Sequence, residues 1–197
     1  MPELRDVVII SAKRTPVGAF QGDLSSVSAS QLGSIAIKAV LEETKVDLNS
    51  IDEVIMGNVL SAGQGQAPAR QAALGAGLPD SVECLTINKM CGSGLKAVML
   101  ATQAIQTGDA EIIIAGGMEN MTQAPYLLPN GRGGHRLGHG QVLDSMIKDG
   151  LWDVYNDKHM GNCAELCASE KNYSREDQDA FAKTSYTRAR SAQENGS

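Results

Sequence analysis

The chain has 197 residues, of which 42% are hydrophobic and 20% are charged. This balance excludes an intrinsically disordered chain, and the length suffices for one domain, or one and a half, with a sizeable core. Lys and Arg number 17 against 23 Asp and Glu, so the net charge is −6 at pH 7. The acidic balance argues against nucleic acid or an anionic membrane surface as the main partner.

The N-terminal segment and the cysteines both indicate a cytoplasmic protein. Residues 1–14 contain no apolar stretch flanked by a basic region, so we expect no secretory signal. The longest apolar runs are too short to cross a bilayer. Four cysteines in such a chain are typical of free cytosolic thiols: Cys84, Cys91, Cys163 and Cys167.

The first two thirds of the chain alternate between short apolar runs and segments of helical periodicity. The apolar runs predict strands over residues 6–11, 54–60, 83–87 and 111–115. The periodic segments predict helices over residues 28–45, 69–76 and 92–107. Strands alternating with helices of this length are typical of an α/β fold with a largely buried sheet.

The alternation stops after the fourth predicted strand. Residues 118–156 are rich in Gly, Pro, Asn and His and show no strong period. A turn-rich stretch of this length is unusual unless it serves a function or packs on a partner. Helices are predicted again over residues 162–172 and 174–195, and the second opens with the capping-box pattern Ser174 to Asp177.

The segment around Cys91 has the strongest chemical signal. It reads as a strand, a short turn and then a helix, which places Cys91 at a helix N-terminus. Unpaired N–H groups and the macrodipole at such a terminus stabilise a thiolate, the nucleophilic form of cysteine. The alternative is a small buried core cysteine, which is the commoner fate of this residue type.

The same segment also matches a dinucleotide-binding pattern. Gly92, Gly94 and Ala97 satisfy G-x-G-x-x-A after a strand. That motif needs an acidic residue at the end of the next strand, whereas Glu111 stands at the start of its strand. For this segment, nucleophilic catalysis by Cys91 is therefore favoured over dinucleotide binding.

A second cluster of metal-ligand residue types occurs later in the chain. His159, Cys163 and Cys167 recur every four residues along one predicted helix face and have the residue types of a zinc site. Three ligands on one helix are geometrically awkward, and no fourth soft ligand is near. We therefore expect packed thiols, no metal, and an exposed or ligand-facing His159 imidazole.

Six ordered segments between residues 6 and 190 have specific sequences: AKRTPVG at 12–18, IMGNV at 55–59, GQAPARQ at 65–71, NKMCGSG at 88–94, AGGMENM at 115–121 and HMG at 159–161. Together they resemble the thiolase family, and among its members the acetyl-CoA acetyltransferases. The resemblance implies an α/β thiolase fold. An N-terminal core domain (residues 1–120), with a mixed sheet and helices on both faces, would precede part of an inserted loop domain (residues 121–197).

The resemblance also implies roles for individual residues. Cys91 corresponds to the acyl-accepting nucleophile of the family, and its N–H to an oxyanion-hole donor. His159 and Met160 match the pair that lines the pantetheine pocket, with Leu151 as an apolar residue beside it. Residues 123–140 resemble the loop through which thiolase dimers pair, which implies a homo-oligomer, a dimer of dimers.

The implied reaction is the reversible condensation of two acetyl-CoA molecules to acetoacetyl-CoA and CoA through an acetyl-cysteine. The expected partners are these CoA thioesters and CoA itself, without a further cofactor or a metal. Two alternatives stay open. One is a degradative 3-ketoacyl-CoA thiolase of broader chain length in fatty acid metabolism. The other is a chain that is inactive alone and serves as a CoA-binding or assembly subunit.

The sequence departs from the family in one large respect. Thiolases are about twice this length, and their second half carries a Gly-His-Pro histidine and a Cys-x-Gly cysteine. Neither motif occurs here, because Gly138-His139-Gly140 lacks the Pro and lies in the segment that resembles the dimer-pairing loop. The chain therefore resembles the N-terminal half of a thiolase.

Overall fold

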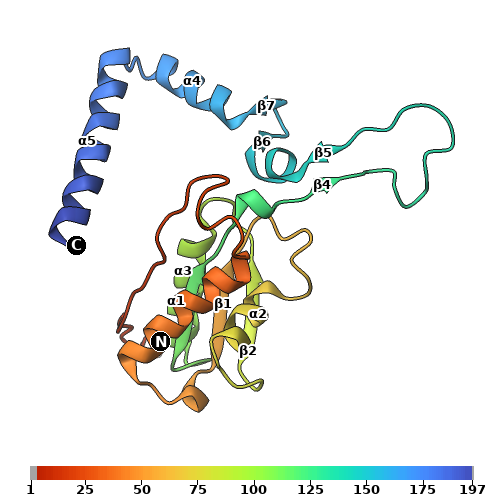
Figure 1. The fold of residues 1–197 in the computed structure, drawn as a ribbon. Coiled ribbons are helices and arrows are strands. Elements are labelled where there is room, and N and C mark those ends of the chain that lie inside the picture. Colours follow the sequence, from red (N-terminus) through yellow and green to blue (C-terminus); the bar gives the residue numbers. More distant parts are fainter. Residues whose placement is uncertain (1–3, 197) are drawn as a thin grey trace. The chain divides into compact units, whose positions relative to one another are not determined.

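The computed structural model describes residues 4–196, which form two compact units, residues 4–150 and 151–196. Each unit is described by itself (Figure 1). The domain boundary expected between residues 120 and 121 stays a prediction. No helix within the described residues is long and apolar enough to cross a membrane.

A three-stranded parallel sheet forms the centre of the first unit. Its strands are β1 (Glu53–Gly57), β2 (Glu83–Ile87) and β3 (Ile113–Gly117), in the order β2-β1-β3. The register aligns all three strands residue for residue, so their carboxyl ends meet at one edge of the sheet. The central strand β1 is almost wholly buried, as its continuous apolar run predicts. Three of the four predicted strands are thus confirmed.

Helices cover both faces of this sheet (Figure 1). Helices α1 (Ala29–Thr44) and α2 (Pro68–Gly75) pack on the face to which β1 turns its first and third apolar side chains. Helix α3 (Ser93–Thr107) packs on the other face, where Ile55 contacts Ala97 and Ala101. Small alanines let helix and strand approach closely. The prediction of helices on both faces is confirmed.

Local signals explain where these helices begin and end. Ser28 caps α1 in a capping box with Gln31, and Lys45 ends the helix in a left-handed conformation. Gly108 ends α3 in the same way, where glycine carries no steric penalty. A 3₁₀ turn η1 (Leu48–Ser50), capped by Asp47, leads from α1 into β1.

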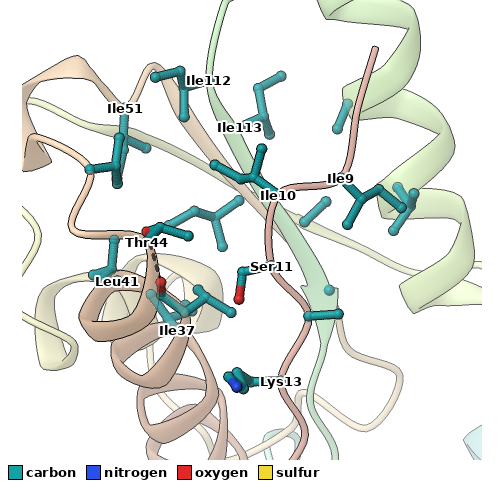
Figure 2. Close-up of a pocket in the computed structure, with 18 of the residues that line it drawn as sticks. Ile9, Ile10, Ser11, Lys13, Ile37, Leu41, Thr44, Ile51, Ile112 and Ile113 are labelled. Atoms are coloured by element: carbon teal, nitrogen blue, oxygen red, sulfur yellow. Dashed lines mark hydrogen bonds between the residues drawn. The ribbon is translucent and has the colours of Figure 1, made fainter.

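The strand predicted over residues 6–11 is wrong. This segment is extended but pairs with no strand among the described residues, and Val8, Ile9 and Ile10 are 67–78% exposed. Residues 7–13 and β3 both line an apolar cavity of about 570 Å³ (Figure 2). No backbone hydrogen bond joins residues 6–11 to β3 in the described part of the chain, so the sheet lacks this strand. The three strands that pair among the described residues are all parallel, whereas a mixed sheet was expected.

The stretch without periodicity contains only short elements. A 3₁₀ turn η2 (Met121–Gln123) is followed by the antiparallel pair β4 (Tyr126–Leu127) and β5 (Leu143–Asp144). Figure 1 shows their connection, residues 128–142, as a long loop, and nearly all of it is exposed. A π-helical turn η3 (Met146–Leu151) follows. The turn-rich character predicted from composition is confirmed.

The second unit is a hairpin followed by two helices. Strands β6 (Trp152–Asp153) and β7 (Lys158–His159) pair antiparallel, and α4 (Met160–Glu170) begins directly after them. Helix α5 (Arg175–Asn195) starts with the predicted capping box, in which Ser174 and Asp177 bond reciprocally. Both predicted helices are confirmed.

Candidate active site

Cys91 lies on a tight turn, residues 88–92, that joins β2 to α3. The turn stands at the carboxyl ends of the parallel strands, where α/β proteins place their ligands. Cys91 is exposed and directly precedes Gly92, the N-cap of α3. The structure therefore places this thiol at an open strand-to-helix turn and not in a core.

Side chains hold this turn through hydrogen bonds to its backbone. The Ser93 hydroxyl accepts a hydrogen bond from the Lys89 N–H at 2.8 Å and donates one to the Met90 carbonyl at 2.6 Å. The Asn88 side-chain oxygen accepts from the Met90 N–H at 2.9 Å. Met90 itself has φ 50°, in the left-handed region. The backbone before Cys91 is thus constrained on both sides.

Close glycine contacts press the start of α3 against the sheet. A Cβ on Gly57 would lie 2.6 Å from the Ser93 carbonyl carbon and 2.7 Å from the Gly94 nitrogen. A Cβ on Gly117 would lie 3.2 Å from the Gly94 Cα. Only residues without a side chain permit this approach. The helix that follows Cys91 is therefore seated directly on the ends of β1 and β3.

Asn58 and Glu119 tie the strand ends together. The Glu119 carboxylate accepts hydrogen bonds from the Asn58 side-chain N–H at 3.0 Å, from Val59 N–H at 2.8 Å and from Leu60 N–H at 3.2 Å. The backbone N–H of Asn58 donates to the Ile87 carbonyl at the end of β2. In the sequence, Asn58 stands within IMGNV at 55–59 and Glu119 within AGGMENM at 115–121, and neither was predicted to have a role of its own. The available signal was their place directly after two strands.

The three residues expected to contact CoA fall in the second unit. The hairpin register pairs Trp152 with His159, while Leu151 ends η3 directly before β6 and Met160 begins α4 directly after β7. His159 also caps α4, because its Nδ1 accepts a hydrogen bond from the Gly161 N–H at 3.0 Å. This bond assigns the neutral ring proton to Nε2. The imidazole therefore keeps one N–H free to donate.

The remaining cysteines differ from Cys91. Cys84 is half-buried, and burial raises the pKa of its thiol. Cys163 is half-buried and Cys167 exposed, both on α4. Across residues 4–196, no three His, Cys, Asp or Glu side chains are grouped closely enough to hold a metal ion. The considered zinc cluster with His159 is therefore not assembled.

The dinucleotide pattern also lacks its acidic partner. Gly92 follows the carboxyl end of β2, whereas Glu111 precedes the amino end of β3. Because the strands are parallel, these residues lie at opposite edges of the sheet. The arrangement that dinucleotide binding needs around Gly92 is therefore not formed by Glu111.

The apolar cavity of Figure 2 is separate from the Cys91 turn. Its walls come from residues 7–13, α1, β3 and α3, and include Ile10, Ile37 and Ile113. Cys91 is not among its lining residues. Most of its lining is aliphatic, and the polar residues Ser11, Lys13, Thr44 and Thr102 also line it.

Comparisons with known proteins give one consistent result. A family model described as "Thiolase, N-terminal domain" matches residues 7–197. The chain is 55% identical to an acetyl-CoA acetyltransferase of Pseudomonas aeruginosa over 98% of its own length and 49% of the relative. It is 57% identical to acetyl-CoA acetyltransferase 1 of Arabidopsis thaliana, over 96% and 46%. The chain spans about half the length of the curated relatives it matches.

A solved structure is similar as well. This is the crystal structure of the Acat5 thiolase from Ascaris suum in complex with coenzyme A, with a TM-score of 0.93 and 41% identity. The match covers 98% of this chain and 50% of that one.

Proposed function

Because this chain belongs to the thiolase family, we propose that it supplies the nucleophilic half of an acetyl-CoA C-acetyltransferase. The complete protein condenses two acetyl-CoA molecules to acetoacetyl-CoA and CoA, and catalyses the reverse thiolysis. The names printed for the relatives at 52–57% identity favour this short-chain enzyme over a degradative thiolase of broader chain length. The proposed location is the cytoplasm.

The first half-reaction transfers an acetyl group to Cys91. Its thiolate attacks the thioester carbonyl, the tetrahedral intermediate collapses, and CoA leaves as a thiol after taking up a proton. The Cys91 N–H is the proposed donor to the oxyanion. The observation that carries the proposal is the exposed Cys91 thiol on a constrained turn directly before α3.

The second half-reaction forms the carbon–carbon bond. A base removes a proton from the methyl group of a second acetyl-CoA, and the enolate attacks the acetyl carbonyl on Cys91. The Cys91 thiolate then leaves and acetoacetyl-CoA is released. No further cofactor is needed, because the thioester itself acidifies the adjacent carbon and hydrogen-bond donors stabilise the enolate. The thiolase resemblance assigns the base to residues of the second half of the family sequence.

The second unit is proposed to bind the pantetheine arm of CoA. Leu151 directly precedes β6 and Met160 directly follows β7, so these two apolar residues flank the hairpin, and His159 retains a free Nε2 donor. An apolar channel with one or two polar groups suits a chain of methylenes and amides. Residues 123–140, which include β4, are the proposed contact through which dimers form a tetramer.

Substitution of the nucleophile tests the proposal. In the complete protein, Cys91→Ala is expected to lower acetoacetyl-CoA formation by at least about 10³-fold, because the covalent intermediate cannot form. Cys167→Ala is the matched control, since Cys167 is also exposed. Activity of Cys91→Ala near that of the control would contradict the proposal. Failure of the unsubstituted protein to condense acetyl-CoA would instead favour a CoA-binding or assembly subunit.

A further inference from the structure

The residue before the nucleophile has an unusual backbone conformation. Met90 has φ 50°, a left-handed conformation that side chains of its length rarely adopt. Such conformations persist only where the surroundings hold them, and they gather at functional sites. The direction in which Cys91 leaves the turn depends on this residue, because the two share a peptide bond.

Ser93 holds the turn from the inside. Its side chain is buried, with the residue only 4% exposed, and its hydroxyl bonds to backbone groups on both sides of the Lys89–Met90 peptide. It accepts from the Lys89 N–H and donates to the Met90 carbonyl, so one oxygen spans the bend. The proposed reaction assigns no step to this hydroxyl.

Asn88 holds the same residue from the outside. Its side-chain oxygen accepts a hydrogen bond from the Met90 N–H at 2.9 Å, and the residue is exposed. With the Ser93 bond to the Met90 carbonyl, both polar backbone groups of Met90 are held by side chains. Rotation of Met90 out of the left-handed region would break these bonds.

Ser93 is in turn fixed to the sheet. A Cβ on Gly57 would lie 2.6 Å from the Ser93 Cβ, so the serine is seated against the end of the buried strand β1. Its hydroxyl therefore starts from a rigid support. The position of the turn is set by the sheet through Ser93.

We infer that Ser93 and Asn88 are positioning residues, which lock Met90 in its left-handed conformation and so fix the direction from which Cys91 attacks the acyl donor. This inference rests on the proposed function. Neither side chain touches the reacting atoms; both act through the Met90 backbone.

The expected effect is on the rate of acetylation and not on substrate affinity. A displacement of about 1 Å in an attacking group can lower a rate by about 10²-fold. Ser93→Ala removes both hydroxyl bonds and leaves the backbone bond from the Ser93 N–H to the Met90 carbonyl at 3.0 Å, so we expect acetyl-Cys91 formation to slow by about 10- to 100-fold. Asn88→Ala removes one exposed bond, and a decrease of roughly 3- to 10-fold is expected. KM for acetyl-CoA is expected to stay within about 2-fold, because the inferred role of both residues is to hold the Met90 backbone and not to bind CoA.

The test measures single-turnover acetylation of Cys91 in the complete protein by rapid mixing with acetyl-CoA. The control variant is Ser34→Ala, which also loses a hydroxyl that donates to a backbone carbonyl, that of Ala72 at 2.9 Å, away from the turn. Both positioning variants are expected to acetylate slowly, while Ser34→Ala acetylates at the unsubstituted rate. Thermal unfolding of each variant separates rate from stability.

Wild-type acetylation rates in both positioning variants, even with lowered unfolding temperatures, would overturn the inference and leave only a structural role. If Ser93→Ala does not fold, Asn88→Ala decides, because its exposed side chain contributes no buried packing. An unchanged rate in that variant overturns the inference. If the unsubstituted protein forms no acetyl-Cys91, both the proposed function and this inference are overturned. If the unsubstituted protein is acetylated and both positioning variants are acetylated at the same rate, only this inference is overturned.

Discussion

Gly57→Ala is expected to damage the Cys91 site through sterics alone. The added Cβ would lie 2.6 Å from the Ser93 carbonyl carbon. This is roughly 0.9 Å short of the optimal separation of about 3.5 Å between carbon atoms. The contact is with backbone, so the start of α3 must move. Gly57 is not in the left-handed region, and backbone strain therefore contributes nothing.

The magnitude follows from this displacement. Overpacking of a core typically costs about 1–3 kcal/mol, and each kcal/mol lowers Tm by about 2–4 °C in a domain of 150–250 residues. A shift of nearly 1 Å at the turn is expected to lower acetylation of Cys91 by up to about 10²-fold.

Gly116→Ala is the matched control for this variant. Gly116 lies on the neighbouring strand β3, and a Cβ there would meet only the Met56 side chain at 3.5–3.7 Å, an ordinary contact. Its Tm and acetylation rate are expected to be close to those of the unsubstituted protein. Thermal unfolding and rapid-mixing acetylation of the complete protein measure both. Equal behaviour of Gly57→Ala and Gly116→Ala would refute the close-packing argument.

Three further predictions concern charge, redox chemistry and association. Burial and the adjacent carboxylate of Glu83 raise the pKa of Glu53, so the charged form of Glu53 destabilises the fold above that pKa, and this penalty disappears as the pH falls. Glu53→Gln should therefore raise the free energy of unfolding at pH 7 by about 0.2–1 kcal/mol in chemical denaturation. No gain in that measurement would contradict this prediction. Peroxide should modify Cys91 first and Cys84 last, because Cys84 is half-buried and the pKa of its thiol is raised. Mass mapping of the oxidised protein checks this order, and early oxidation of Cys84 would refute it. Residues 1–197 expressed alone should self-associate through α3, because Leu95 on that helix is 70% exposed. Leu95→Lys should shift the sedimentation coefficient toward that of a monomer. Unchanged association in this variant would exclude the α3 face as the contact.

The sequence predicted the sheet well where a strand is buried by its own neighbours. Strand β1 has helices on both faces and partners on both edges, so its apolar run alone indicates its state. Residues 6–11 have an equally apolar run but no hydrogen-bonded partner strand. An apolar run indicates only that a segment is suited to burial. A strand also needs a neighbouring strand within hydrogen-bonding distance, which the run itself does not predict.

The position of Cys91 was predictable, but the contacts that hold its turn were not. Local order predicts a cysteine at a strand-to-helix turn, because strand, turn and helix follow directly in the chain. The bonds between Asn58 and Glu119 join residues 61 positions apart, and the contact between Gly57 and Ser93 depends on how a helix crosses the sheet. Such contacts are set by tertiary packing, and neither hydrophobic periodicity nor secondary-structure propensity predicts them.

Covalent trapping of the acyl-enzyme tests the central claim most directly. The complete protein is mixed with isotopically labelled acetyl-CoA, quenched in acid, digested and mapped by mass spectrometry. We predict that the label is found on the peptide that contains Cys91 and that it is released when unlabelled CoA is added before the quench. Label on another residue, such as the exposed Cys167, or the absence of any covalent label, would contradict the assignment of Cys91 as the acetyl acceptor.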